Sequence, residues 1–179
     1  MTAKSSREVK PPLRNTKSPP RIPAKRRCRA FASGVANWFE GNGRSFPWRK
    51  KSVGHYGKIV SEVLLQRTRA ETVGDFFPGF TKQFPSWKAL SEASKAEIGK
   101  TLVPIGIWRR RSEVLFNLAR EVRSRGGRFP CTREELETMT GVGQYVASAI
   151  LLFVHGQPEP LLDSTMARVL ERYFGPRAL

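Results

Sequence analysis

The chain has 179 residues, and its 32 lysine and arginine residues outnumber 15 aspartate and glutamate residues, giving a formal net charge of +17. This length fits one compact domain, and a charge this positive predicts a polyanionic partner. The longest unbroken apolar run, residues 149–154, is far shorter than the roughly 18 residues of a membrane-spanning helix. No apolar stretch follows the basic N-terminus, so we expect an intracellular protein without a secretory signal.

Proline and basic residues dominate residues 1–27, where Glu8 is the single acid, so we expect a disordered basic tail there. We interpret its Lys25-Arg26-Arg27 cluster as added affinity for phosphates, with a nuclear targeting signal as the alternative. Residues 28–179 are also strongly basic and contain the expected folded domain. The folded part itself is therefore expected to bind an anion.

Apolar residues recur at helical spacing from residue 28 onward, and no segment alternates as a strand would. The first helix would present one apolar face, made of Phe31, Val35, Trp38 and Phe39. The second would bury Tyr56, Ile59, Val60, Val63 and Leu64. Further helices are expected over about 70–83, 86–92, 95–102, 110–125, 132–139, 144–155 and 165–174. The predicted fold class is all-α.

A glycine-rich turn, Gly141-Val142-Gly143, lies between two of these expected helices. Two glycines allow a sharp turn, while Val142 would anchor it to the core. The helix that begins near Gln144 would then present unpaired N–H groups and the positive end of its dipole to a phosphate. This pattern is typical of a helix–hairpin–helix, and a plain turn between helices fits the same spacing.

Three further segments stand in order around this turn: Phe46-Pro47-Trp48-Arg49, residues 61–68 (SEVLLQRT) and residues 161–170 (LLDSTMARVL). Together the four motifs resemble the helix–hairpin–helix (HhH-GPD) DNA glycosylase superfamily over about residues 31–175. The nearest groups are the adenine glycosylases of MutY type and the thymine or uracil mismatch glycosylases. The resemblance implies a monomer that acts on double-stranded DNA carrying a mispaired base.

The resemblance assigns the catalytic aspartate to Asp163. A carboxylate there would stabilise the positive charge on the sugar C1′ as an N-glycosidic bond breaks, or would orient the attacking water. Asp163 would also serve as the N-cap of the helix that follows. Glu62 matches the glutamate that protonates the leaving base in adenine glycosylases, and burial would raise its pKa. The alternative is a solvated acid paired with Arg69.

Tyr145 stands where bifunctional members such as endonuclease III carry a lysine that forms a Schiff base. A phenol cannot form that adduct, so the resemblance implies base removal without efficient strand scission. The alternative for Tyr145 is a purely structural role in the first turn of an apolar helix.

Gln66 and Arg67 match residues that reach into the DNA near the flipped base, and Ile107 stands where relatives place an intercalating side chain. Ile107 could equally belong to the core. The basic run that follows, Arg109, Arg110 and Arg111, is expected to contact phosphates, with a solvated helix face as the alternative.

The chain departs from the family in two ways. Many relatives continue further and end in four cysteines that hold a 4Fe–4S cluster, whereas this chain stops at Leu179. We therefore expect an incomplete C-terminal region and no cofactor, with a cluster only if the natural protein is longer. The two cysteines present, Cys28 and Cys131, stand far apart and predict no metal site. Thr165 replaces an asparagine usual in both nearest groups.

These observations favour a monofunctional glycosylase of base-excision repair that flips and removes thymine or uracil opposite guanine, because Tyr145, Arg67 and the Ile107 segment resemble that group. Removal of adenine opposite guanine or 8-oxoguanine is the alternative. A third interpretation, from another class, is a truncated DNA-binding remnant without catalysis.

Overall fold

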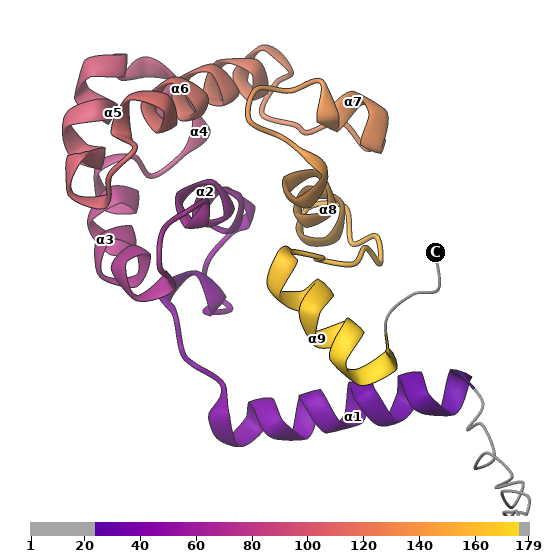
Figure 1. Ribbon diagram of the computed structural model, residues 1–179. Helices are drawn as coiled ribbons and strands as arrows, with labels where there is room; N and C mark the ends of the chain where they lie inside the picture. Colours follow the sequence, from indigo (N-terminus) through magenta and orange to yellow (C-terminus); the bar gives the residue numbers. More distant parts are fainter. Residues whose placement is uncertain (1–23, 176–179) are drawn as a thin grey trace, which may run out of the picture. The chain divides into compact units, whose positions relative to one another are not determined.

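The computed structural model describes residues 24–175 (Figure 1). The chain divides into two compact units, Met1–Gly43 and Arg44–Leu179. The described part of the first unit is helix α1 (Ala24–Asn42) with the residue that follows it. This helix begins inside the segment 1–27 that we expected to be disordered, because alanine, lysine and arginine at its start favour helix propagation. Residues 1–23 of the expected tail lie outside the described residues.

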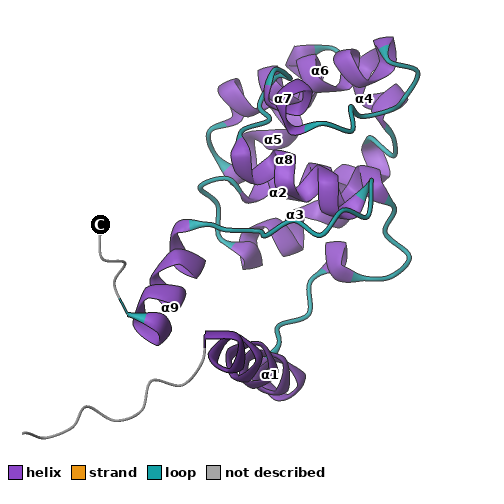
Figure 2. Cartoon of the chain, turned by 90° about the vertical axis from the view of Figure 1, so that its right-hand side faces the viewer, coloured by secondary structure: helices purple, strands orange, loops and turns teal. Residues whose placement is uncertain are grey.

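The second unit holds the remaining helices, and its described part contains no strand (Figure 2), which confirms the all-α prediction. The helices are α2 (His55–Leu65), α3 (Ala70–Gln83), α4 (Trp87–Glu92), α5 (Lys95–Leu102), α6 (Trp108–Ser124), α7 (Arg133–Glu137), α8 (Gln144–Phe153) and α9 (Ser164–Phe174). Two short 3₁₀ turns, η1 (Pro47–Arg49) and η2 (Val103–Ile105), were not expected from the sequence. Both begin with or contain a proline at the first positions, where a missing N–H costs no hydrogen bond.

Polar side chains at the helix starts explain why the expected boundaries agree with the observed ones within a few residues. Ser94 and Glu97 form a reciprocal capping box at the start of α5. Ser86 caps α4, and Thr132 caps α7, each by accepting a backbone N–H. These caps are local signals, so they act before any tertiary contact forms.

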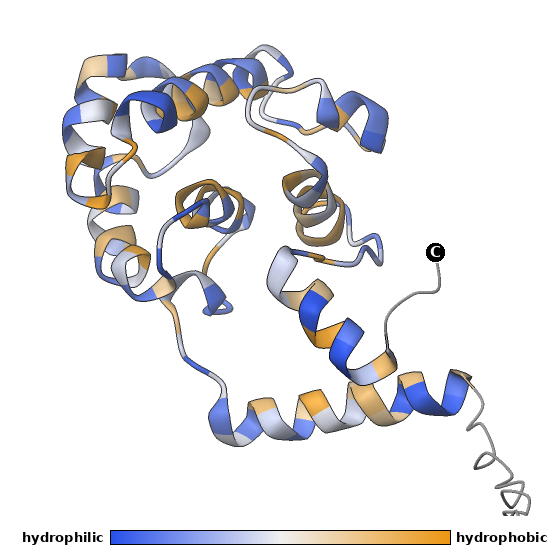
Figure 3. Cartoon of the chain, viewed as in Figure 1, coloured by the Kyte–Doolittle hydropathy of each residue, from blue (hydrophilic) through white to orange (hydrophobic). Residues whose placement is uncertain are grey.

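Helix α2 lies at the centre of the second unit, with α3, α6 and α8 packed around it (Figure 1). The side chains of Ile59, Val60 and Leu64 have no exposed surface. Helices α2 and α8 are the most apolar of the unit, as Figure 3 shows by their orange colour. The predicted buried face of α2 is confirmed, except that Tyr56 is only partly buried. The end of this helix and the start of α8 line one cavity.

The glycine-rich turn is held to the side of α6 by three contacts. Glu121 of α6 accepts hydrogen bonds from the backbone N–H and the hydroxyl of Thr140. Val142 is buried, as predicted. Gly141 has a φ of +74°, and a Cβ added there would collide with Cγ1 of Val114 on α6. Only glycine therefore fits at this position.

We predict that Gly141→Ala lowers the free energy of unfolding by about 2–4 kcal/mol, because the left-handed backbone and the collision both add cost. Gly156→Ala is the matched control: Gly156 also has a positive φ, +67°, with open space around it. It should lose only about 1 kcal/mol. Urea denaturation measures both variants. In a Val114→Ala background the two losses should become equal, and an unchanged difference would contradict the steric explanation.

Candidate active site

One cavity of about 710 Å³ brings together residues from three separate segments of the second unit. Its walls come from the stretch between the end of α2 and the start of α3, from the start of α8 and from the start of α9. The lining residues are Glu62, Leu65, Gln66, Thr68, Ala70, Gly143, Gln144, Tyr145, Val146, Asp163 and Thr165. All three candidate catalytic residues, Glu62, Tyr145 and Asp163, are among them, and the volume suits a small organic ligand such as a nucleobase.

Glu62 is half-buried on α2, next to the fully buried core. Burial raises the pKa of its carboxyl from 4.5 to about 7, while a hydrogen bond from the Tyr145 hydroxyl and the positive charge of Arg49 oppose that rise. Among the described residues, Glu62 forms no ion pair with Arg69, the partner that the alternative interpretation gave it. A carboxyl with a pKa near neutrality can exchange a proton with a substrate or a water molecule at physiological pH.

Tyr145 is hydrogen-bonded to Glu62 and lies near enough to Asp163 for its pKa to respond to that charge. Burial raises the pKa of its phenol to about 12, and the negative charges of Glu62 and Asp163 add to the rise. The phenol thus stays protonated and donates its hydrogen bond to Glu62. Tyr145 is also packed against the core, so the structural role left open above is compatible with its place in the cavity.

Asp163 caps α9, because its Oδ1 accepts a 2.7 Å hydrogen bond from the backbone N–H of Met166. The side chain itself is exposed at the cavity rim. Its other oxygen, Oδ2, accepts no hydrogen bond from the part of the chain that the structure describes. The cap holds the carboxylate at the rim and uses only one of its two oxygen atoms. Thr165 lines the same rim.

Arg49 lies near the candidate catalytic residues, although the sequence analysis gave it no role. It is the last residue of the Phe46-Pro47-Trp48-Arg49 motif. The turn η1 carries it, and two buried aromatic rings fix that turn: Phe46 and Trp48 stack at 4.8 Å between ring centroids. Trp48 in turn packs edge-on against Phe77 of α3. The charge of Arg49 lowers the pKa of both Glu62 and Tyr145, which locates the guanidinium near them.

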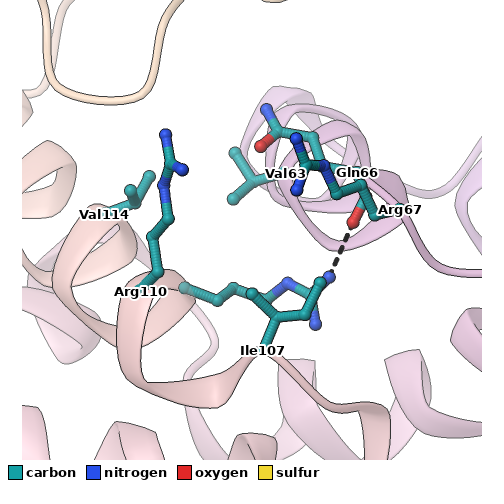
Figure 4. A pocket seen from close by; sticks show the side chains of 7 residues that line it. Val63, Gln66, Arg67, Ile107, Arg110 and Val114 are labelled. Carbon is teal, nitrogen blue, oxygen red and sulfur yellow. Dashed lines mark hydrogen bonds between the residues drawn. The ribbon is translucent and has the colours of Figure 1, made fainter.

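A second, smaller cavity of about 380 Å³, drawn in Figure 4, shares the lining residue Gln66 with the first. The end of α2 forms one wall and the start of α6 forms the other. The residues around it are Val63, Gln66, Arg67, Ile107, Arg110, Arg111 and Val114. Ile107, which is distant in sequence from Gln66 and Arg67, thus lines the same cavity as these two other predicted DNA-penetrating residues.

The segment around Ile107 divides into exposed and packed side chains. Ile107 is 49% exposed and is therefore no core residue. Trp108 packs against the core, and the guanidinium of Arg109 lies 4.5 Å from the centre of its ring. Arg109 and Arg110 are exposed, as phosphate contacts would require.

Arg111 corrects the prediction that the whole basic run contacts phosphates. It is only 5% exposed, and its guanidinium donates hydrogen bonds to protein oxygen atoms. The sequence held a signal for this burial: Arg111 is in helical register with the buried Leu115, Leu118 and Val122 of α6. The helical spacing of the apolar residues therefore predicts that Arg111 lies on the apolar face of α6.

The start of α8 lacks a side-chain cap, as the predicted phosphate contact would require. Gly143 is the N-cap, and it has no side chain to satisfy the first N–H groups of the helix. Gly141, Gly143 and Gln144 are exposed, whereas Val142 faces the core. An anion at this surface would meet free N–H groups and the positive end of the helix dipole.

In the described residues, no group of three or more histidine, cysteine, aspartate or glutamate side chains could hold a metal ion. A 4Fe–4S cluster takes four cysteine ligands, and the two cysteines of this chain cannot supply them. No described helix is both long and apolar enough to span a membrane.

Residues 60–178 match the family described as HhH-GPD superfamily base excision DNA repair protein. A thymine-DNA glycosylase from Aeropyrum pernix is 36% identical over 86% of this chain and 70% of that protein. A thymine/uracil-DNA glycosylase from Pyrobaculum aerophilum is 38% identical over 81% of this chain and 64% of that protein. The human adenine DNA glycosylase is 31% identical over 80% of this chain and 28% of that protein.

The chain spans about two thirds of the length of the thymine and thymine/uracil glycosylases that it matches. The solved structure of a thermostable thymine-DNA glycosylase has a TM-score of 0.77 at 31% identity, over 85% of this chain and 70% of that one. A trapped endonuclease III–DNA complex, with a TM-score of 0.68 at 18% identity over 84% of this chain and 70% of that one, shares the fold. These matches confirm the resemblance drawn from the four motifs. The chain belongs to the HhH-GPD superfamily of base-excision DNA repair proteins, among its DNA glycosylases.

Proposed function

We propose that this protein removes thymine or uracil mispaired with guanine from double-stranded DNA by hydrolysing the N-glycosidic bond. The observation that carries the proposal is the meeting of Glu62, Tyr145 and Asp163 in one cavity beside the hairpin. Relatives named thymine and thymine/uracil glycosylases, which are 36% and 38% identical to this chain, support the choice of base.

In the proposed reaction, the bond between C1′ and N1 of the base breaks, and the base leaves with the electron pair. The sugar then carries positive charge, which the Asp163 carboxylate stabilises from the cavity rim. Water attacks C1′ and gives its proton to Glu62, whose pKa near 7 suits that transfer. Tyr145 holds the Glu62 carboxylate by its hydrogen bond and forms no covalent adduct with the sugar.

DNA binding in this proposal uses the exposed groups around the two cavities. The N-terminus of α8, with Gly141, Gly143 and Gln144 at its surface, would take a backbone phosphate. Ile107 would enter the base stack, while Gln66 and Arg67 would occupy the space that the flipped base leaves. The exposed Arg109 and Arg110 would contact phosphates beside the wedge.

Adenine removal is the second candidate, and the raised pKa of the Glu62 carboxyl supports it. At neutral pH a carboxyl with a pKa of about 7 is half protonated, so it can donate a proton to a leaving adenine. The human adenine DNA glycosylase, 31% identical over 151 residues, is the matching relative. A DNA-binding remnant without catalysis is the third candidate, and direct measurement of base release separates all three.

We predict that single-turnover reactions release the base from T:G and U:G duplexes, but not from A:G or A:8-oxoguanine duplexes, and leave the strand intact until alkali is added. Asp163→Asn should lower the rate by about 10³-fold or more, because the amide cannot balance the charge on the sugar. Asparagine caps a helix as well as aspartate does, so α9 should stay intact. The exposed Asp75→Asn on α3 is the control and should keep full activity.

Two other results would redirect the assignment. Release from the adenine duplexes alone would establish adenine as the substrate. Binding of mismatched DNA without release of any base would favour the remnant.

The pH dependence of base release gives an independent prediction. If Glu62 takes a proton from water, the single-turnover rate of base release should rise about tenfold between pH 6 and pH 8. The reason is that the ionised fraction of a carboxyl with a pKa of about 7 rises by that factor over this range. Arg49→Ala should move the midpoint to higher pH, since the positive charge of Arg49 lowers that pKa. A rate that falls above pH 7 would instead mark Glu62 as the acid of an adenine glycosylase.

Stability should depend on pH through the same carboxyl. The folded state raises the pKa of Glu62 from 4.5 to about 7, so its favourable contribution is complete below pH 4.5 and is lost as the pH rises through 7. Glu62→Gln should therefore be more stable than wild type at pH 8, by at most about 3 kcal/mol, and equal to it near pH 4. Urea denaturation at both pH values measures this difference. Glu92→Gln, at an exposed acid of α4, should show none.

A further inference from the structure

Two loops of the second unit meet at the smaller cavity, and one buried side chain joins them. We call residues 66–68, after α2, the plug loop, and residues 105–107, before α6, the wedge loop. The guanidinium of Arg111 donates 2.8 Å hydrogen bonds from Nη2 to the Gln66 carbonyl and to the Thr68 hydroxyl. Its Nη1 donates to the carbonyl of Gly106 at 2.8 Å and approaches that of Ile105 at 3.4 Å. Figure 4 draws the bond to Gln66 as a dashed line between the two walls.

The tips of both loops have strained backbones. Arg67 has a φ of 58° and Ile107 a φ of 52°, and in the part of the chain that is described no other residue besides glycine has a positive φ. A left-handed backbone is unfavourable for side chains of this size, and most of all for β-branched isoleucine. Arg111 holds the neighbours of both tips, because its acceptors flank Arg67 and precede Ile107.

Burying the Arg111 guanidinium costs desolvation free energy, and apolar packing alone gives no reason for a charged residue at this position. Removal from water lowers the pKa of its guanidinium, which is the effect expected for a buried cation. Its hydrogen-bond partners are neutral oxygen atoms of the two loops, and it makes no salt bridge in the described residues. An apolar side chain in line with Leu115 and Leu118 would fill the same space without that cost. The planar guanidinium, with donors on two sides, is suited to joining separate acceptors.

We propose that Arg111 is a positioning residue that joins the plug loop to the wedge loop and holds both tips in the conformation that enters DNA, before DNA binds. This inference rests on the proposed function of Gln66, Arg67 and Ile107. Preformed tips cost no ordering entropy when the base is extruded, and a misplacement of about 1 Å can cost about 100-fold in rate. Gln66 also lines the larger cavity, so the same contacts hold part of its wall.

Extrusion from a duplex needs the plug and the wedge, whereas a base in a single strand is already unstacked. Loss of Arg111 should therefore lower activity on a duplex much more than on the same single strand. A general structural defect would lower both activities together, because the catalytic residues serve both substrates. The ratio of the two rates therefore separates positioning from simple destabilisation.

The first measurement uses hydrogen–deuterium exchange in the free protein. In wild type, the Thr68 N–H donates to the Leu65 carbonyl and the Gly106 N–H to the Val103 carbonyl, both at 3.2 Å, so both loops carry amides that can report opening. In Arg111→Met, exchange should accelerate about tenfold or more in both loops together, while peptides from α8 stay unchanged. Arg111→Lys keeps the charge but lacks the fork that spans two loops, so it should accelerate both loops as well.

Acceleration in one loop alone, in neither, or throughout the protein for both variants would overturn the joining role. The control is Arg120→Met, which removes the same charge from the exposed side of α6 and should leave both loops unchanged.

The second measurement compares uracil release from a U:G duplex and from the same single strand. Arg111→Met and Arg111→Lys should lower the ratio of duplex rate to single-strand rate about 10- to 100-fold. Arg120→Met should keep the wild-type ratio, and an unchanged ratio in the Arg111 variants would overturn the proposal. If wild type releases no uracil from either substrate, the proposed function fails, while the exchange measurement still decides whether Arg111 joins the loops.

Discussion

The burial of α2 among α3, α6 and α8 is the constraint on which the candidate site depends. Ile59, Val60 and Leu64 have no exposed surface, so α2 cannot rotate without moving apolar side chains into water. This fixed rotation sets the direction of every other side chain on the helix. Glu62 emerges at the edge of the buried face, and Gln66, where the helix ends, lines both cavities.

Helix α6 fixes the positions of the plug loop, the wedge loop and the glycine-rich turn. At its start, Arg111 holds the loops on both sides of the smaller cavity. One turn later Val114 packs against Gly141, and Glu121 accepts two hydrogen bonds from Thr140. The same helix therefore positions the wedge, the plug and the hairpin. Because the apolar face of α6 is buried, the distances between the wedge loop, the plug loop and the hairpin are fixed. A fixed arrangement suits recognition of a rigid partner such as a duplex.

Two ionisable groups oppose the apolar packing around them: Glu62 is half-buried at its edge, and Arg111 is buried on the apolar face of α6. Burial raises the pKa of one and lowers that of the other, so each charge opposes its own burial. Local conflicts of this kind are expected where function, and not stability, selects the residue. For Glu62 the result is a carboxyl poised near neutral pH. For Arg111 it is a rigid connection between two loops that have strained backbones.

The sequence by itself determined the all-α class, most helix boundaries and the membership of the family, because helical period, caps and ordered motifs are local signals. It also singled out Glu62, Tyr145 and Asp163 as candidate catalytic residues, and the fold brings these candidates to one cavity. The tertiary structure alone decided that Arg49 approaches Glu62, because that proximity depends on how η1 packs against α3. It also decided that Arg111 joins two loops, since hydrogen bonds between segments distant in sequence depend on how helices pack, which no local pattern encodes.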